Sequence, residues 1–246
     1  MIPRAVPSSP RARSAARRGS SLTAFTLVEL VIVIGVIALL AGIVLPSVGR
    51  ARELAKQVGC MSNLRQLGVA FNGYATSGVG TFPFHADVGG QYREDWIHWQ
   101  AGRDLKQSAV ARYLASTSPD TFRCPSDDVM VRPRVLTEPY RYSYTFNYLF
   151  AGNGPIRPTL AAVKRPADKL LVVDENETSL DDGNWHPQLV GSGVENFVSV
   201  RHDHRPAREG VGYDDERVGH AVFADGHAGA ITRRESRDAK RYDPTR

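Results

Sequence analysis

The sequence predicts an α+β fold in which one long N-terminal helix packs on a C-terminal domain built around an antiparallel β-sheet. Three observations predict this fold. Residues 25–45 form an apolar run of about 20 residues, long enough to cross a bilayer as one helix. Apolar residues at helical spacing continue to about residue 75. Residues 76–246 carry short apolar runs separated by Gly, Pro, Asn and Tyr, as expected for short strands and frequent turns.

Residues 1–24 form a basic leader that is a targeting segment rather than part of the fold. The leader contains no acidic residue and five arginines, which are Arg4, Arg11, Arg13, Arg17 and Arg18. Without them the chain has 26 basic and 26 acidic residues, so the net charge of +5 comes from the leader and does not indicate nucleic-acid binding. Positive charge marks the cytoplasmic side of a membrane helix. We therefore expect a single-pass inner-membrane protein with a cytoplasmic N-terminus and a periplasmic or extracytoplasmic C-terminal domain.

The helix is predicted to run from residue 25 to 75, with 25–45 spanning the membrane and a kink near Pro46. Glu29 is the only charged residue between Phe25 and Leu45. An ionised carboxylate costs a few kcal/mol or more in lipid unless a partner neutralises it. Gly and Ala at positions 35, 38, 41 and 42 favour close approach of neighbouring membrane helices.

The residues Ala24-Phe-Thr-Leu-Val-Glu29 resemble the cleavage and methylation motif of type IV pilins and type II secretion pseudopilins. The resemblance implies that a prepilin peptidase cuts between Ala24 and Phe25 and that Phe25 becomes N-methylated. It implies that Glu29 pairs with the terminal amine of a neighbouring subunit during assembly. The family usually has Gly before the cut, and Ala24 departs from that pattern while keeping a small residue.

Two further segments resemble the planctomycete-type prepilin-like family. They are residues 60–74 after the membrane segment and Phe122-Arg-Cys-Pro125. Members of that family end in a motif of His, nine residues and Asp-Gly. Here Asp225-Gly226 fits its end, and His202 or His204 fits its start only if about a dozen residues, 205–217, are inserted.

These resemblances imply a pilin-like fold and a structural, non-enzymatic subunit of a secretion pseudopilus or a type IV pilus-like filament. The expected partners are the prepilin peptidase, copies of the chain or related pilin subunits, the assembly platform and the membrane. No cofactor is expected for that role.

Five segments of the C-terminal domain are predicted strands: residues 142–149, 170–173, 197–200, 221–224 and 228–232. The last two flank Asp225-Gly226, a strong hairpin signal. The charged tail from 233 to 246 is predicted to be a frayed end.

The chain has two cysteines, Cys60 and Cys124. An even pair outside the cytoplasm favours a disulfide, which would close a loop of roughly 60 residues and stabilise by about 3–4 kcal/mol. Two free buried thiols are the alternative.

Histidines and acids gather late in the sequence, and His202, Asp225 and His227 are candidates for a divalent metal site. Their spacing matches no known ligand pattern, so a structural role is the first reading. The alternative function is a membrane-tethered metal-dependent hydrolase that uses this late cluster. Residues 95–99, with Trp96 and Trp99, are predicted to be core or a packed loop, with a ligand-binding face as the alternative.

Overall fold

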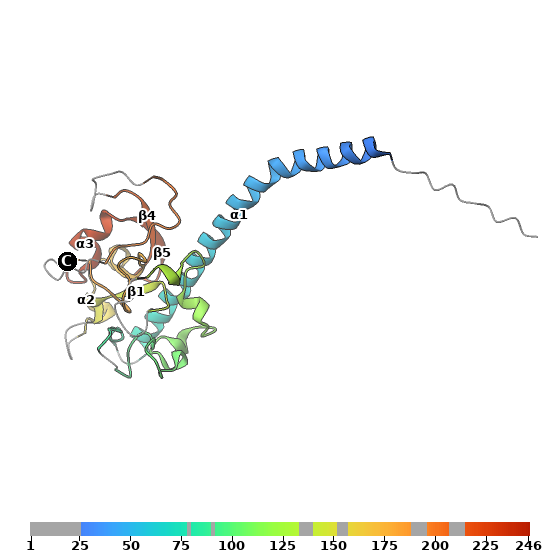
Figure 1. Cartoon of the computed structure of the whole chain (residues 1–246). Helices are drawn as coiled ribbons and strands as arrows, with labels where there is room; N and C mark the ends of the chain where they lie inside the picture. The colour runs from blue at the N-terminus through green and yellow to red at the C-terminus, as the bar shows by residue number, and fades with distance from the viewer. Residues whose placement is uncertain are drawn as a thin grey trace, which may run out of the picture. The chain divides into compact units, whose positions relative to one another are not determined.

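The computed structural model describes residues 26–77, 80–89, 92–132, 140–151, 157–187, 196–206 and 215–246. The chain divides into two compact units, Met1–Val48 and Gly49–Arg246, called the N-terminal and C-terminal units below. The boundary lies inside the long helix α1, Leu27–Thr76 (Figure 1).

Helix α1 has 50 residues and confirms the predicted long helix. Pro46 lies inside it without ending it, and the kink near this residue stays a prediction. In the C-terminal unit, one stripe of the helix is buried, with Leu64, Leu67, Phe71 and Tyr74 at spacings of three and four residues. That spacing places the four side chains on one face, which forms part of the core.

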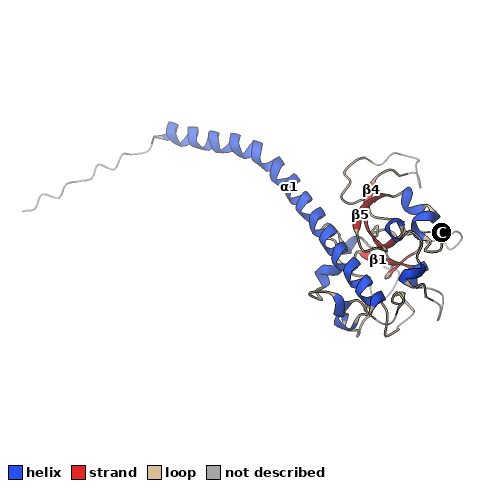
Figure 2. Cartoon of the chain, turned by 180° about the vertical axis from the view of Figure 1, so that it is seen from behind, coloured by secondary structure: helices blue, strands red, loops and turns tan. Residues whose placement is uncertain are grey.

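The sheet has five strands in the order β3-β1-β2-β4-β5. Their bounds are Tyr144–Asn147 for β1, Leu170–Asp174 for β2, Asn184–Trp185 for β3, Val218–Phe223 for β4 and Ala228–Thr232 for β5. Figure 2 shows these strands in red within the C-terminal unit. The remaining elements are short: α2 Tyr148–Ala151, α3 Ala239–Tyr242, and 3-10 turns at Leu105–Gln107, Ala111–Tyr113, Pro119–Phe122, Val129–Val131, Leu160–Ala162, Pro166–Asp168 and Glu235–Arg237.

The predicted antiparallel sheet is wrong in one respect, because the sheet is mixed. Strand β3 pairs parallel with β1, with Phe146 opposite Asn184, and the other pairs are antiparallel. The two-residue strand is held by contacts outside the sheet: the Asn184 side chain accepts from Ala86 N at 3.0 Å, and the Trp96 indole donates to Gly183 O at 2.8 Å. A strand this short carries no readable alternation in the sequence.

The two faces of the sheet have separate cores. Phe146, Val172 and Val222 share a row and pack in the core that includes the buried stripe of α1. The neighbouring row, with Val173 and Ala221, packs in the second core. All these residues are buried, as expected for strands covered on both sides.

The second core corrects two predictions. Residues 197–200 contribute only an isolated bridge, between Val198 and Glu175, and not a strand. The tail is not frayed: Tyr242 is buried, its ring lies 6.4 Å from that of Trp185, and its carbonyl accepts from the Asn147 amide at 2.8 Å. Aromatic burial therefore outweighs the polar composition of the tail.

The predicted hairpin at Asp225-Gly226 is confirmed and lies against α1. Gly226 has φ +92°, a conformation that favours glycine, and its N–H donates to Phe223 O at 2.8 Å. A Cβ on Gly68 of α1 would lie 2.5 Å from Gly226 O and 2.9 Å from Val222 Cγ1. Helix and turn therefore approach so closely that each needs a glycine.

The aromatic cluster at residues 95–99 is packed inside the C-terminal unit, which confirms the prediction of core or a packed loop. Trp96 is fully buried, and Trp99 is partly buried with its indole N–H donating to Ala86 O at 2.7 Å. Both indole N–H groups donate to backbone carbonyls of the protein itself, so they are not free to bind a ligand as the alternative requires.

Candidate functional site

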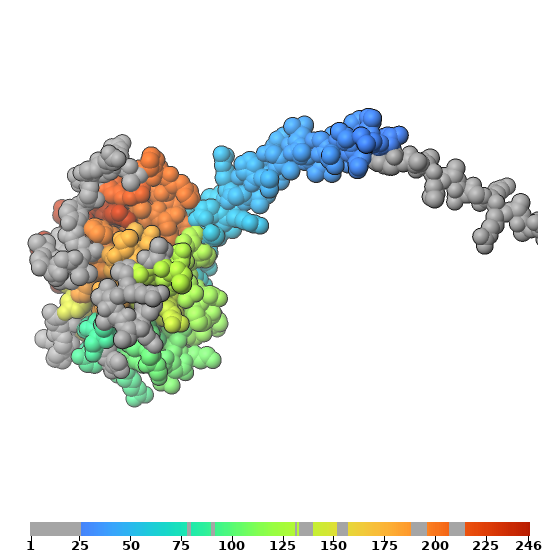
Figure 3. Space-filling model, viewed as in Figure 1, coloured from blue at the N-terminus to red at the C-terminus, as the bar shows by residue number. Residues whose placement is uncertain are grey.

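The first half of α1 carries the first candidate site. From Leu27 to Leu45 its large apolar side chains are exposed, and this part of the helix is long and apolar enough to cross a membrane (Figure 3). A Cβ added at Gly35 or Gly42 would meet nothing within 4 Å. Among the described residues, no part of the chain covers the large apolar side chains of this segment.

Glu29 caps the start of this helix. Its carboxylate accepts from Thr26 N at 2.9 Å and from Thr26 Oγ1 at 2.8 Å, and Thr26 Oγ1 accepts from Glu29 N at 3.2 Å. This reciprocal arrangement is a capping box, whose Thr-x-x-Glu signature is visible in the sequence. Ala24 and Phe25 lie outside the described residues, so the cleavage site stays a prediction.

A second candidate site is buried in the C-terminal unit. Four residues form it and are called the Cys/Asp/His cluster: Cys60 from α1, Cys124 from the segment after Pro119–Phe122, Asp174 at the end of β2 and His202 from a turn. One ligand-type atom from each residue lies within 4.8 Å of all the others. Residues separated by more than a hundred positions thus meet at one point.

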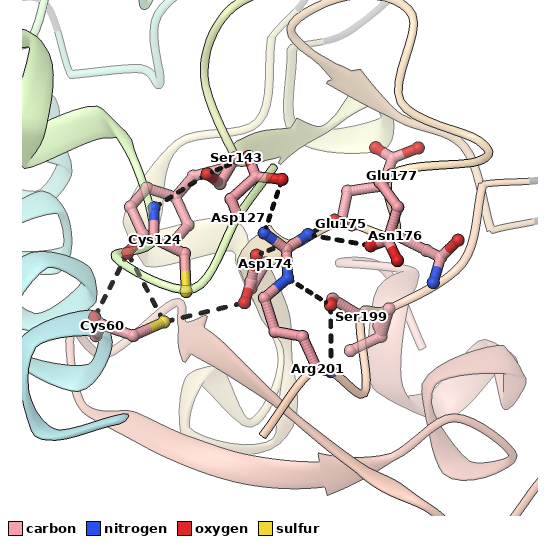
Figure 4. A network of polar contacts seen from close by, with 12 residues as sticks. Cys60, Cys124, Asp127, Ser143, Asp174, Glu175, Asn176, Glu177, Ser199 and Arg201 are labelled. Carbon is pink, nitrogen blue, oxygen red and sulfur yellow. Dashed lines mark hydrogen bonds and ion pairs between the residues drawn. The ribbon is translucent and has the colours of Figure 1, made fainter. Parts of the chain in front are cut away.

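The two sulfur atoms have different neighbours. The Cys60 thiol donates to Asp174 Oδ2 at 3.7 Å, and the Tyr144 hydroxyl donates to Cys60 Sγ at 3.4 Å. Cys124 Sγ lies 3.1 Å from His202 Nε2. Figure 4 shows both sulfur atoms at one end of a polar network that continues through Asp174.

His202 is held from both sides of its ring. Its Nε2 faces the sulfur of Cys124, and its Nδ1 lies 3.2 Å from Glu53 Oε1. Glu53 also accepts from the Ser126 hydroxyl at 2.9 Å and pairs with Lys56 at 3.5 Å. Because the carboxylate can only accept, Nδ1 carries the proton in this contact, and Nε2 is the ring nitrogen that faces the cluster. The His202 side chain is 2% exposed.

Arginine side chains pair with two buried carboxylates beside the cluster, and Figure 4 shows one of them, Arg201, next to Asp127 and Asp174. Arg201 lies 3.5 Å from Asp174 Oδ1 and 2.9 Å from Asp127 Oδ1. Asp127 also pairs with Arg132 and accepts from the Ser143 hydroxyl at 2.6 Å. One arginine is therefore present for each of these two carboxylates, as buried charge requires.

The cluster perturbs its own ionisable groups. The hydrogen bond between the two thiols raises the pKa of Cys60 and lowers the pKa of Cys124, to which His202 and Arg201 add. Burial raises the pKa of Asp174 well above its usual range, and Arg201 opposes that rise. Cys124 is thus the sulfur that ionises more readily.

The predicted disulfide between Cys60 and Cys124 is not formed in this structure. The residues come together as it requires, but both are free, buried thiols. Each sulfur has a polar neighbour, Asp174 for Cys60 and His202 for Cys124. The juxtaposition was predicted correctly, and the covalent bond itself stays a prediction.

The predicted metal candidates His202, Asp225 and His227 do not form one site. His202 belongs to the buried cluster, whereas Asp225 and His227 pair with each other at 2.6 Å on the exposed β4–β5 turn. The His227 ring also stacks on Phe223 with centroids 4.3 Å apart. The turn conformation explains the correction, because it directs the Asp225 and His227 side chains to each other. Residues 207–214 of the expected inserted segment lie outside the described residues.

Two open hollows border His202. One, of roughly 390 Å³, is also lined by Gln57, His204 and His220, and the other, of roughly 500 Å³, extends along α1 past Glu53. The His220 ring lies 5.3 Å from that of His202 and its Nε2 lies 3.3 Å from the Gln57 amide. Both hollows therefore border the cluster at His202, and none of its other three residues lines them.

Sequence reasoning did not bring Asp174 and Glu53 into a site with the cysteines. Asp174 lies 114 positions after Cys60, and Glu53 lies 149 positions before His202. No local spacing carries such a signal. The only hints are that Cys60 and Glu53 share a helix at two-turn spacing and that Asp174 ends an apolar strand.

Comparison with protein-family models, with curated proteins and with solved structures finds no match for this chain.

Proposed function

We propose that this chain is a prepilin-like structural subunit that assembles through the first half of α1 into a type II secretion pseudopilus or a type IV pilus-like filament. In this proposal a prepilin peptidase cuts between Ala24 and Phe25, and Phe25 is N-methylated. The subunit begins as a single-pass inner-membrane protein with its C-terminal unit outside the cytoplasm. Its other partners are copies of itself or related subunits and the assembly platform.

The observation that carries the proposal is a single carboxylate at the start of an otherwise apolar, uncovered helix. Glu29 is the only acidic or basic residue from Leu27 to Leu45, where the large apolar side chains are exposed. A plain anchor gains nothing from a charge that costs a few kcal/mol or more in lipid. A subunit interface does gain from this charge, because an ammonium on one chain and a carboxylate on the next offset the free-energy cost of burying each other.

The capping box fits a two-stage role for Glu29. Before processing, the carboxylate satisfies Thr26 at the helix start. Cleavage before Phe25 would place a new amine one residue from Thr26, and the corresponding amine of a neighbouring chain would then compete for the same carboxylate. The ammonium carries a full positive charge, which the Thr26 amide and hydroxyl lack, so it adds a charge–charge attraction that favours the exchange on assembly.

Small residues along the same segment support helix-to-helix packing. Gly35 and Gly42 leave open space where a Cβ would lie, and Ala38 and Ala41 fall between them. In membranes, such small residues let backbones approach and gain van der Waals contact. The helix therefore has room for neighbouring helices along the membrane segment.

The alternative of a membrane-tethered metal-dependent hydrolase loses its proposed ligand set. Asp225 and His227 form a pair on an exposed turn, while His202 belongs to a cluster with four ligand-type side chains of its own. Catalytic zinc sites keep a position open for water or substrate, and four protein ligands close it. The structural proposal is therefore the better supported of the two.

The mature N-terminus tests the proposal. We expect mass spectrometry of the full chain, isolated from membranes of cells with a prepilin peptidase, to find N-methylated Phe25 as the first residue. Replacing Ala24 by Leu should block the cut because the residue before it must be small, whereas Ala16→Leu in the same leader should leave it unchanged. A wild-type chain that keeps its arginine-rich leader would contradict the proposal.

A further inference from the structure

We propose that the Cys/Asp/His cluster is a structural site for a divalent d10 cation, zinc first, bound by Cys60, Cys124, Asp174 and His202. The inference is independent of filament assembly. It replaces the late His/Asp ligand set expected from the sequence with one that the fold brings together.

The donor atoms select the class of metal. Two sulfurs, one imidazole nitrogen and one carboxylate oxygen suit zinc, whereas calcium and magnesium take oxygen ligands. Tetrahedral zinc with bonds of about 2.3 Å to sulfur and about 2.1 Å to nitrogen or oxygen places such ligands about 3.5 Å apart. Two separations lie on either side of that value, 3.7 Å from Cys60 Sγ to Asp174 Oδ2 and 3.1 Å from Cys124 Sγ to His202 Nε2, and all four atoms lie within 4.8 Å of one another.

The groups around the ligands orient them as a metal site requires. A zinc-bound histidine almost always donates its other ring N–H to a carboxylate or carbonyl. His202 does so toward Glu53 at 3.2 Å while Nε2 points to the cluster. Arg201 holds the outer oxygen of Asp174 at 3.5 Å, and the Cys124 backbone N–H donates to Ser143 Oγ at 2.8 Å. The protein's own contacts thus orient these ligand side chains.

The charge also balances. Arg132 pairs with Asp127, and Arg201 pairs with both Asp127 and Asp174, so two buried arginines stand beside these two carboxylates. A divalent cation replaces the two thiol protons, which leave to solvent, and two sulfur–metal bonds replace two S–H bonds. The buried charge is unchanged by that exchange, so no uncompensated ion is created.

The site lies where a cross-link would hold the fold together. Its ligands come from α1, the segment before β1, the end of β2 and the turn after Val200. Four protein ligands make a closed, structural site rather than a catalytic one. An open hollow lined by Glu53, Gln57 and His202 borders the histidine ligand.

Metal titration of the full chain in detergent tests the inference. The reduced, chelator-treated protein is titrated with zinc, and with cobalt as a spectroscopic probe. We expect about one equivalent bound per chain, with a sulfur-to-cobalt charge-transfer band and the visible absorption of tetrahedral cobalt. We also expect the free energy of unfolding to rise with zinc.

Variants locate the ion. His202→Gln and the double variant Cys60→Ser with Cys124→Ser should abolish stoichiometric binding, and Glu53→Gln should weaken it roughly 10–100-fold through the histidine. His227→Gln, an exposed histidine outside the cluster, is the matched control and should bind as the wild type does. If a cluster variant fails to fold, circular dichroism detects it. The weaker binding by Glu53→Gln, together with the sulfur band in the cobalt spectrum of the wild type, then still decides the site.

Three results would overturn the inference. One is a reduced wild-type protein that binds well under one equivalent of zinc. Another is cobalt binding that lacks a sulfur band or that His227→Gln removes. The third is a protein isolated from cells with no metal and an intact disulfide between Cys60 and Cys124, which would make the cluster a redox cross-link instead.

Discussion

The two halves of α1 differ in the environment that their sequences require, although they share one continuous backbone. From Leu27 to Leu45 the helix is apolar on all sides apart from Glu29, and its large apolar side chains are exposed. From Gly49 to Thr76 it is apolar on one stripe, where Leu67 and Phe71 are fully buried. A helix that is apolar all round needs lipid or partner helices, whereas a striped helix is satisfied by its own domain. The comparison therefore separates the residues that we propose for assembly from the residues that form the core of the C-terminal unit.

The largest expected difference between the halves concerns side-chain truncation. Phe71 is fully buried, and its ring lies 4.8 Å from that of Phe146 and 5.6 Å from that of Trp96. Phe71→Ala should lower the free energy of unfolding of the C-terminal unit by about 3–5 kcal/mol, because it leaves a cavity. Leu39→Ala, at a position that is 68% exposed, should change it by less than about 0.5 kcal/mol. Denaturant titration of the full chain in detergent measures both, and equal effects would remove the distinction.

A smaller difference is expected between matched glycines. A Cβ at Gly68 would lie 2.5 Å from the backbone oxygen of Gly226, whereas one at Gly35 would meet nothing within 4 Å. Gly68→Ala should therefore destabilise the C-terminal unit by about 1–3 kcal/mol, despite the better helix propensity of alanine. Gly35→Ala should leave that unit unchanged. The same titration checks the pair, and a Gly68→Ala variant as stable as the wild type would show that α1 and the β4–β5 turn are not in close contact.

The sequence predicted the elements that carry a long or regular signal. The helix was predicted to within a residue or two of its observed ends, and the hairpin around Asp225-Gly226 was predicted with its turn. Both depend on local chemistry, namely helical spacing and a glycine with positive φ. The parallel strand Asn184–Trp185 was missed because two residues have no period, and the tail was misread because Tyr242 alone among charged neighbours gives it a buried anchor.

The two candidate sites also differ in how far the sequence could predict them. Glu29 stands out locally, as the one charge in an apolar run. The Cys/Asp/His cluster depends on tertiary structure, because its residues meet only after α1 packs on the sheet and the turn at His202 closes over the end of β2. Pairing the two cysteines was within reach of sequence reasoning, since the chain has only two. Their partnership with Asp174 and His202 was not.

The central claim is that the carboxylate of Glu29 serves assembly and not only the helix start. Glu29→Gln tests it most directly, because glutamine keeps the capping box with Thr26 and removes only the charge. We predict that this variant inserts into the membrane and keeps a folded C-terminal unit, while sheared filaments recovered by sedimentation fall at least tenfold. Glu94→Gln, an exposed carboxylate in the C-terminal unit, should give wild-type yield. Wild-type filament yield from Glu29→Gln would contradict the account and leave Glu29 as a helix cap.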